Sequence, residues 1–361
     1  MMTNYYFISS PFHLFLACNL SIENSNDKNI AIIIPKITNI KVVSNTFVKA
    51  MKSAKNIFSE FTSFERANDG IPFRNKHDER KYRFGVIELL LKKEPADRIY
   101  TGNDRRIEFQ FAMHIANKFR YDVTGIYMDD GMATYLGHKS MNTIIHQYIE
   151  PLIKKIVYGN WWKHPNTSGG SAWINTLYVA FPEHVHFSVK NKSIKNINYD
   201  IFQTTQFKDF CLKQLEQFDV DAKKIDGIKV LVVITHESFY PDGYHHIVKV
   251  IEKAKQLTEE KYIAIKAHPR SEKIVDLKND FPNCMHIGNK LGFEMLLPLL
   301  PDDCLLIGDA STAVFTARWL KPVMKIRAIK IVDESKAELH KELEKLYTKI
   351  NVPVVNMNDD W

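Results

Sequence analysis

The chain has 361 residues, of which 45% are hydrophobic, 12% aromatic and 25% charged, an ordinary globular composition with room for two domains of usual size. Its formal net charge of +7 is spread along the chain, and neither a zinc-finger spacing nor an RNA-binding aromatic signature accompanies it. These features argue against nucleic acid as a partner and favour anionic ligands or an anionic membrane surface.

The four cysteines lie far apart and form no CxxC pair, as expected for reduced core residues of a cytosolic protein. The apolar N-terminus lacks a basic n-region and is interrupted by Ser9-Ser10-Pro11, so it does not read as a signal peptide. No stretch approaches the roughly 20 apolar residues that span a bilayer. We therefore expect a cytoplasmic protein, and leave open a peripheral contact with the cytoplasmic face of the inner membrane.

Strands and helices alternate along the first half. An apolar strand over 5–8 leads through a Ser-Ser-Pro turn into a helix that begins near Phe12, with proline at the first helical position. The continuous apolar run 31–34 suits a buried strand of a parallel sheet. The other elements expected here are helices over 42–58, 84–92, 108–119 and 143–157, strands over 98–101, 123–128 and 177–180, and a polar loop over 68–81.

The segment 189–198 breaks this alternation with three lysines and three asparagines, and we expect it to be a linker. The alternation then resumes with strands over 228–234, 262–267, 285–287, 304–307 and 323–326 and helices over 207–218, 244–257, 292–299, 311–320 and 334–350. No repeat of solenoid period is present. The pattern predicts an α/β protein of two Rossmann-like, doubly wound domains, 1–200 and 201–361, that face each other across a cleft. The pattern leaves open whether the terminal helix, expected over 334–350, packs back on the first domain.

Three expected strand ends carry side chains suited to chemistry: Asp129-Asp130-Gly131, His268-Pro269 and, at a helix start, Ser311-Thr312. Each has an ordinary structural explanation, since an acidic pair before glycine commonly forms a turn and Ser-Thr at a helix start is commonly an N-cap. Ligands of open α/β sheets, however, bind beyond the carboxyl ends of the strands. A helix N-terminus can hold a phosphate, His268 can protonate it, and an acid of the pair can take a proton from a hydroxyl.

In this order the three motifs resemble those of bacterial sialyltransferases, in particular lipooligosaccharide sialyltransferases and capsular polysialyltransferases. The opening Phe7–Leu14 resembles the first strand and turn of these enzymes, and Phe293-Glu294 resembles their ribose-binding element. The resemblance implies a GT-B fold and an inverting transfer of sialic acid from CMP-sialic acid to a glycan hydroxyl of lipooligosaccharide or capsular polysaccharide. It implies no cofactor and no metal.

The resemblance also implies roles for individual residues. Asp129 would be the general base, with Asp130 supporting the loop in the N-terminal, acceptor-side domain. The C-terminal domain would bind the CMP donor, with His268 on the leaving phosphate. The remaining donor-binding residues implied or guessed in this way are Pro269, Glu294, Ser311, Thr312, Thr235 and Ser10.

The adjacent carboxylates could instead suggest a metal site, because magnesium is held by one or two carboxylates together with substrate phosphates. Adjacent residues of an extended chain point to opposite sides, however, which disfavours a shared ligand set.

Two other functions stay open. One is transfer of another CMP-activated acid sugar such as Kdo, and the other is an inert glycan-binding or capsule-assembly protein. A binding protein has no need of a base, which favours an enzyme. The sequence sets neither the acceptor, the linkage, the number of sugars added nor the oligomeric state.

Overall fold

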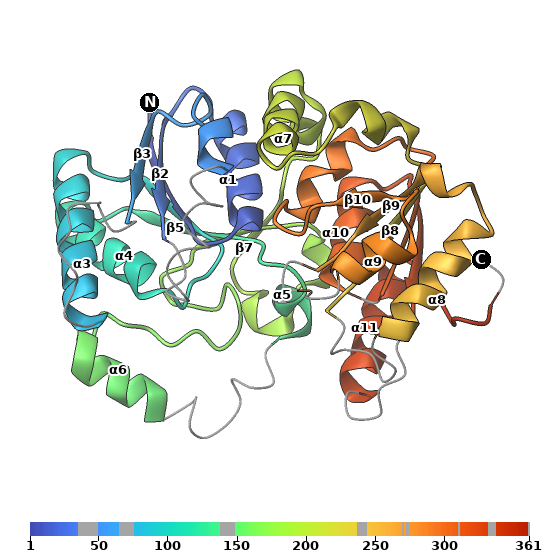
Figure 1. The fold of residues 1–361 in the computed structure, drawn as a ribbon. Coiled ribbons are helices and arrows are strands. Elements are labelled where there is room, and N and C mark those ends of the chain that lie inside the picture. The colour runs from blue at the N-terminus through green and yellow to red at the C-terminus, as the bar shows by residue number, and fades with distance from the viewer. Residues whose placement is uncertain are drawn as a thin grey trace. The chain divides into compact units, whose positions relative to one another are not determined.

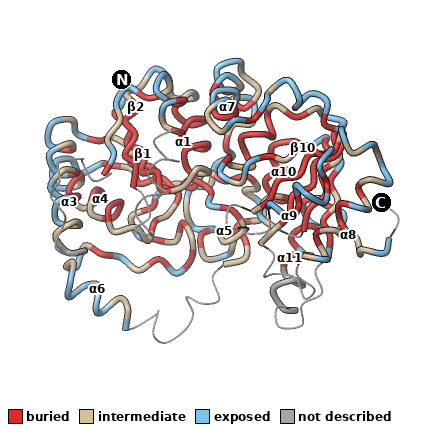
Figure 2. The backbone as a smooth tube through the Cα atoms, viewed as in Figure 1, coloured by how far each residue is buried: buried red, intermediate tan, exposed pale blue. Residues whose placement is uncertain are grey.

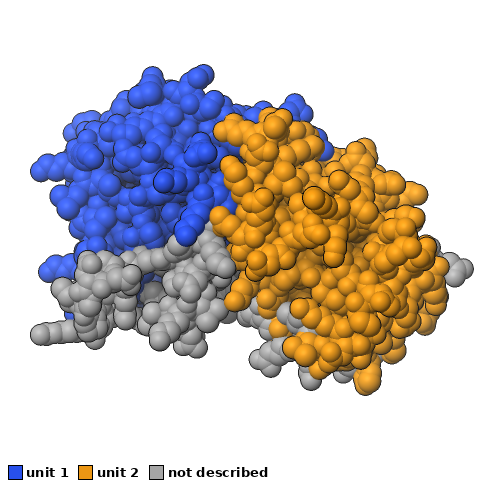
Figure 3. Space-filling model, turned by 45° about the horizontal axis from the view of Figure 1, so that its top comes forward, with its two compact units in different colours: residues 1–201 blue, residues 202–361 orange. Residues whose placement is uncertain are grey.

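The computed structural model describes residues 1–34, 50–64, 76–137, 149–236, 244–268, 271, 274–309, 311–330 and 337–359. The chain divides into two compact units, Met1–Ile201 (unit 1) and Phe202–Trp361 (unit 2), coloured separately in Figure 3. The sequence-based boundary was placed after residue 200, next to this division. Each unit has its own parallel sheet and its own core.

Unit 1 is built on a seven-stranded sheet in the order β3-β2-β1-β4-β5-β6-β7, and all of its strand pairs are parallel. Its strands are β1 (Thr3–Ile8), β2 (Lys28–Ile33), β3 (Glu60–Ser63), β4 (Arg98–Thr101), β5 (Thr124–Met128), β6 (Thr176–Val179) and β7 (Ser193–Asn196). Its helices are α1 (Pro11–Glu23), α3 (Lys76–Lys93), α4 (Ile107–Phe119), α5 (Ala133–Leu136) and α6 (Glu150–Tyr158). Strand β1, in the interior of the sheet, is buried along its whole length, as the apolar run over 5–8 predicts (Figure 2).

Unit 2 has a six-stranded parallel sheet in the order β10-β9-β8-β11-β12-β13. Its strands are β8 (Val230–Val233), β9 (Ile263–Lys266), β10 (Met285–Ile287), β11 (Leu305–Asp309), β12 (Lys325–Ile329) and β13 (Val354–Val355). Its α-helices are α7 (Thr205–Gln217), α8 (Tyr244–Lys255), α9 (Ile274–Asp280), α10 (Thr312–Leu320) and α11 (Ala337–Lys349) (Figure 1). Aliphatic side chains of β8, β9 and α8 form the core of this unit.

In both sheets the order in which the chain adds strands reverses at one point. The strand order within each unit places the first strand beside the second on one side and beside the fourth on the other, so the connections run outward both ways. A ligand crevice forms at this switch point, beyond the carboxyl ends of the two neighbouring strands. The switch points lie between β1 and β4 in unit 1 and between β8 and β11 in unit 2.

Several sequence-based boundaries were wrong. The expected linker 189–198 contains β7, which pairs in parallel with β6 at the edge of the sheet. Its residues Ser193, Lys195 and Asn196 are exposed, because an edge strand has water on one side, and this polar composition hid the strand. Helix α3 begins at Lys76, inside the expected loop, while residues 65–75 lie outside the described part of the chain. The expected helix 292–299 consists of two short 3₁₀ turns.

All four cysteines are buried and unbridged. No helix in the described part of the chain is both long enough and apolar enough to cross a membrane.

Candidate active site

The acidic pair follows β5 directly, and its first member is enclosed by hydrogen-bond donors. One carboxylate oxygen of Asp129 accepts hydrogen bonds from the Gly131 amide at 3.0 Å and the Thr134 hydroxyl at 3.2 Å. The other accepts from the Ala180 amide at 3.0 Å and from the Tyr135 hydroxyl. Asp129 is 1% exposed. Its carboxylate therefore ties the loop after β5 to the end of β6.

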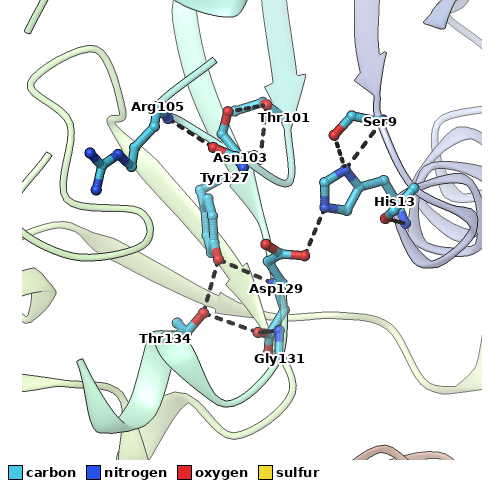
Figure 4. A network of polar contacts seen from close by, with 11 residues as sticks. Ser9, His13, Thr101, Asn103, Arg105, Tyr127, Asp129, Gly131 and Thr134 are labelled. Carbon is cyan, nitrogen blue, oxygen red and sulfur yellow. Dashed lines mark hydrogen bonds and ion pairs between the residues drawn. The ribbon is translucent and has the colours of Figure 1, made fainter. Parts of the chain in front are cut away.

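Burial raises the pKa of Asp129 to about 6, although its four donors act in the opposite direction. Gly131 completes the loop with φ 88°, a left-handed conformation that a side chain would strain. The Tyr127 hydroxyl accepts a hydrogen bond from the Asp130 amide at 3.1 Å and lies 3.0 Å from the Thr134 hydroxyl (Figure 4). The acidic loop is thus held at several points.

The second acid points to the other side of the chain, as the alternation of an extended segment predicts. The side chain of Asp130 is 38% exposed, and its Oδ1 lies 2.9 Å from Nε2 of His13, whose side chain is 3% exposed. His13 belongs to the first turn of α1, so the pair joins the ends of β1 and β5. Asp130 is the acid of the pair that is accessible to solvent.

The hydrogen bonds of His13 determine which ring nitrogen carries the proton. Nδ1 lies 3.1 Å from the Ser9 hydroxyl and 3.4 Å from the Ser9 amide (Figure 4). A backbone amide can only donate, so Nδ1 accepts, and the proton of the neutral ring is on Nε2, facing Asp130. Ser10 caps α1 by accepting a hydrogen bond from the His13 amide at 3.1 Å. The turn after β1 thereby holds the His13 imidazole in place, and this imidazole in turn orients the Asp130 carboxylate.

The end of β4 leaves room for this imidazole. A Cβ atom on Gly102 would lie 2.3 Å from the His13 ring, so only glycine allows the ring to lie against the backbone there. The turn is closed by the Thr101 hydroxyl, which lies 3.1 Å from both the amide and the carbonyl of Asn103. His13 and Asp130 therefore lie at the switch point of unit 1.

Asp104 anchors the same turn. It is 2% exposed, and one of its carboxylate oxygens accepts a hydrogen bond from the Ser171 amide at 2.8 Å. Burial raises the pKa of this carboxyl group to about 6. The loop before β6 is thus tied to the turn after β4.

This raised pKa gives stability a defined dependence on pH. The folded state binds the Asp104 proton more tightly than the unfolded state, so the stability contribution rises as pH falls from about 6 towards the unfolded pKa of 3.8. Relative to Asp104→Asn, the wild type is expected to gain about 1 kcal/mol in unfolding free energy between pH 7 and pH 5. Denaturant unfolding of both proteins at the two pH values measures this. A loss of stability of the wild type relative to the variant on acidification would contradict it.

In unit 2, the ends of β8 and β11 are joined by Asp309. Its Oδ2 accepts hydrogen bonds from the amide and the hydroxyl of Thr235, both at 3.2 Å. Its Oδ1 lies 3.5 Å from Nε2 of His246 in α8. The side chain of Asp309 is 2% exposed. The expected donor contact Thr235 thus lies at the switch point of unit 2, where this carboxylate positions it.

His268 follows β9, the neighbour of β8, and is half-buried. Its ring is perpendicular to that of His236, with ring centroids 5.7 Å apart. Pro269 lies outside the described residues. The two imidazoles therefore lie side by side at the carboxyl ends of β8 and β9.

Ser311 occupies the N-cap position of α10 with an extended backbone, and its side chain makes no capping hydrogen bond. Its carbonyl accepts a hydrogen bond from the Tyr347 hydroxyl at 2.8 Å, which ties it to α11. Thr312 is the first residue of α10 and is exposed. The N-terminus of this helix therefore presents a hydroxyl and backbone amides just beyond the switch point.

Glu294 is 9% exposed and lies in a 3₁₀ turn, Phe293–Met295. A Cβ atom on Gly292 would lie 2.5 Å from its Oε1, so the carboxylate folds back over the turn. The buried Lys266 at the end of β9 donates a hydrogen bond to the Ala267 carbonyl at 3.0 Å. Burial lowers the pKa of Lys266 to about 8, and the charge of Glu294 opposes this shift.

The expected site residues thus form two groups. Asp129, Asp130 and Ser10 gather at the switch point of unit 1, and Thr235, His268, Ser311 and Thr312 lie at strand ends and a helix start of unit 2. Within the described residues, no group of three or more His, Cys, Asp or Glu side chains is arranged to hold a metal ion.

The sequence analysis did not select four residues that complete these groups: His13, Tyr135, His236 and Asp309. His13 and Asp130 are 117 residues apart, and no local pattern connects them. His236 follows the buried strand β8 and Asp309 ends the buried strand β11, and these positions at strand ends were the available signal.

Three comparisons with known proteins bear on this geometry. Residues 4–330 match the family model described as alpha-2,8-polysialyltransferase (POLYST). A comparison with curated protein sequences gives no match.

Solved structures with a similar fold include the GT-B domain of a Photobacterium damselae sialyltransferase, with 16% identity, a TM-score of 0.59 and coverage of 98% of this chain and 100% of that chain. The alpha/beta-galactoside alpha-2,3-sialyltransferase of Photobacterium phosphoreum has 15% identity and a TM-score of 0.57, with coverage of 98% of both chains. The UDP-GlcNAc 2-epimerase of Methanocaldococcus jannaschii has 13% identity and a TM-score of 0.53, with coverage of 99% of this chain and 89% of that chain. At these identities the likeness establishes the fold, which is GT-B, as expected.

Proposed function

Because the chain belongs to the alpha-2,8-polysialyltransferase family, we propose that it transfers sialic acid from CMP-sialic acid to a glycan hydroxyl of lipooligosaccharide or capsular polysaccharide, with inversion at the anomeric carbon. The observation that carries the proposal is the accessible Asp130 carboxylate, held by the buried His13 at the switch point of unit 1. A sugar hydroxyl needs a base at such a position, and a binding protein does not.

The base is Asp130 in this proposal. The sequence-based expectation placed it on Asp129, whose raised pKa would suit a base. A hydroxyl could reach that buried carboxylate only by displacing one of its four donors. Asp130 has its Oδ1 on His13 and is more than one third exposed, so it can accept a proton without disturbing the loop.

In the reaction, the acceptor hydroxyl oxygen forms a bond to the anomeric carbon and gives its proton to Asp130. The bond from that carbon to the phosphate oxygen breaks, and CMP leaves with the electron pair. His268 donates a hydrogen bond or a proton to the leaving phosphate, and the N-terminus of α10 with Ser311 and Thr312 stabilises its charge. Glu294 holds the ribose hydroxyls. Ser10 and Thr235 shape the turns beside these groups.

The proposal includes no metal ion. The two carboxylates of the acidic pair face different partners, the β6 end for Asp129 and α1 for Asp130, so they offer no common ligand set. Transfer rates with EDTA and with added magnesium are expected to be equal. A rate that depended on magnesium would overturn this part of the proposal.

Mass analysis of products tests the function. CMP-sialic acid is offered with lactose, other galactosides and sialylated glycans, and the masses report which acceptor gains sialic acid and how many residues are added. At least one acceptor is expected to be sialylated. Hydrolysis of the donor without any sialylated product would contradict the proposal.

Transfer of another CMP-activated sugar is the second candidate, because the acidic pair and the phosphate-binding residues would serve Kdo equally well. Parallel reactions with CMP-Kdo separate the two. Turnover with CMP-Kdo and none with CMP-sialic acid would replace the proposed donor.

His13 acts as a positioning residue, and its replacement tests this role. Glutamine can still donate a hydrogen bond to Asp130, whereas leucine cannot. His13→Gln is expected to keep transfer within about tenfold of wild type, and His13→Leu to lower kcat by about 10–100-fold with unchanged CMP affinity. Equal losses of kcat in both variants, or a loss confined to thermal stability, would contradict the role.

The enzyme is proposed to act in the cytoplasm. The four buried, unbridged cysteines suit a reducing compartment.

A further inference from the structure

Helix α6 turns Glu150, Lys154 and Tyr158 towards the body of unit 1. Glu150 forms an ion pair with Arg105 at 3.0 Å and with Lys154 at 2.6 Å. The Lys154 ammonium lies 4.6 Å from the centre of the Trp162 ring, which is fully buried. The Tyr158 hydroxyl accepts a hydrogen bond from Arg80. These side chains recur every four residues along α6 and make one face of the helix, which is anchored to the protein.

The opposite face of α6 is aliphatic and faces water. Its side chains, which we call the aliphatic face, are exposed by 47% to 75%: Ile149, Leu152, Ile153, Ile156 and Val157. Among the described residues, no other nine-residue stretch carries more than two exposed large hydrophobic side chains. Figure 2 shows the helix as mostly exposed, and Figure 1 places it at the periphery of unit 1, beyond α3 and α4. A surface helix usually has the opposite orientation, with its apolar face inwards.

The chemistry of this face favours lipid as its occupant. Protein interfaces draw their binding energy from tryptophan, tyrosine and arginine, and aliphatic residues such as leucine and valine are under-represented among their hot spots. The aliphatic face contains only leucine, isoleucine and valine. A helix of nine residues is about 13 Å long, too short to bury by itself the roughly 800 Å² per partner of a stable protein complex.

The charge around α6 selects an anionic lipid surface. Lys155 is exposed beside the aliphatic face, and the single carboxylate of Glu150 is shared by Arg105 and Lys154, so cations outnumber anions there. The chain as a whole carries +7. An interfacial helix combines buried apolar side chains with basic residues that attract anionic headgroups.

We propose that α6 is a membrane-docking element that lies flat on an anionic lipid surface, with its aliphatic face at the boundary between headgroups and acyl chains. The surface is separate from the residues proposed for transfer, and the inference does not depend on the activity. The proposal places the peripheral membrane contact, which the sequence left open, on the aliphatic face of α6.

Vesicle co-sedimentation of the full chain tests the proposal. Wild type is expected to sediment with vesicles of phosphatidylcholine and phosphatidylglycerol and weakly with phosphatidylcholine alone. The double variant Leu152→Ser/Ile156→Ser is expected to lower vesicle affinity at least about tenfold. Lys155→Gln is expected to lower it roughly fivefold on the anionic vesicles only. Val323→Ser, which removes an aliphatic side chain exposed by 72% in unit 2, is the matched control and should bind as wild type does.

Two further readouts keep the result clear. Thermal unfolding and CMP binding of all variants should match wild type, since none of the replaced side chains supports the fold or the donor site. The proposal is overturned if wild type does not bind anionic vesicles, or if the double variant binds them with the same affinity as wild type. It is also overturned if wild type is a dimer in solution that the double variant dissociates, because the aliphatic face would then bind a second copy.

Discussion

Asp130→Asn is expected to lower kcat for sialyl transfer by about 10²–10⁴-fold, the range that a general base contributes, while CMP affinity stays unchanged. The amide retains the size of the carboxylate and can still accept a hydrogen bond from His13, but it can take no proton. Because Asp130 is accessible and contacts His13 at the surface of the switch point, thermal stability should change little. Initial rates with saturating CMP-sialic acid, together with CMP titration, measure these effects.

Asp122→Asn is the matched control, since Asp122 is an exposed acid at the other end of the same strand region and pairs with Arg120. Its transfer rate should equal that of wild type. Asp129→Asn serves as the contrasting variant. The NH₂ group of the new amide would face hydrogen-bond donors, from which it cannot accept, and we therefore expect a loss of about 1–3 kcal/mol in unfolding free energy. Full stability of Asp129→Asn with no transfer, alongside active Asp130→Asn, would move the base to Asp129.

His268→Ala is expected to reduce kcat/KM for transfer by about 10²–10³-fold and to weaken CMP binding as well. The imidazole lies at the end of β9 beside His236, where a phosphate bound at the N-terminus of α10 would need a donor. Loss of this donor affects the bound phosphate in the ground state and the leaving CMP in the transition state. CMP titration and steady-state kinetics separate the two effects.

His245→Ala provides the control, because His245 is an exposed histidine of α8 in the same unit. It should leave CMP binding and transfer unchanged. If His268→Ala bound CMP as wild type does and transferred at the wild-type rate, the donor site would have to be placed elsewhere. Weakened CMP binding with an unchanged kcat would leave His268 a binding role only.

The fold was predictable from the sequence because buried parallel strands contain continuous apolar runs. Apolar runs of this kind predict β1, β2, β8 and β9, and Ser10 and Pro11 predict the start of α1. Of the edge strands, β10 was expected over 285–287. The edge strands β3, β7 and β13 were missed, since β3 and β7 have exposed polar residues and β13 has two residues only. Their place depends on the neighbouring strand and not on their own composition.

The site was predictable only as a set of strand ends. Asp129-Asp130 and His268 were selected as candidates because each follows an apolar run, but their surroundings come from distant parts of the chain. Burial by Ala180 and Tyr135 distinguishes the two acids, and His13 holds one of them. These contacts require the tertiary fold, so the sequence could not assign the base between two adjacent carboxylates.

The orientation of α6 shows the same limit. The sequence predicts a helix over 143–157, of which residues 143–148 lie outside the described part of the chain and the rest overlaps α6, but it does not predict which face of the helix contacts the protein. The ion pair between Glu150 and Arg105 turns the polar face inwards, and Arg105 lies 45 residues away in sequence.

The most direct measurement is nuclear magnetic resonance of the reaction between CMP-sialic acid and a galactoside acceptor, which reports the new glycosidic bond and its anomeric configuration. The account predicts a sialylated product whose configuration is opposite to that of the donor, formed by wild type and lost in Asp130→Asn. A product that retains the donor configuration, or release of free sialic acid with no glycoside, would contradict it.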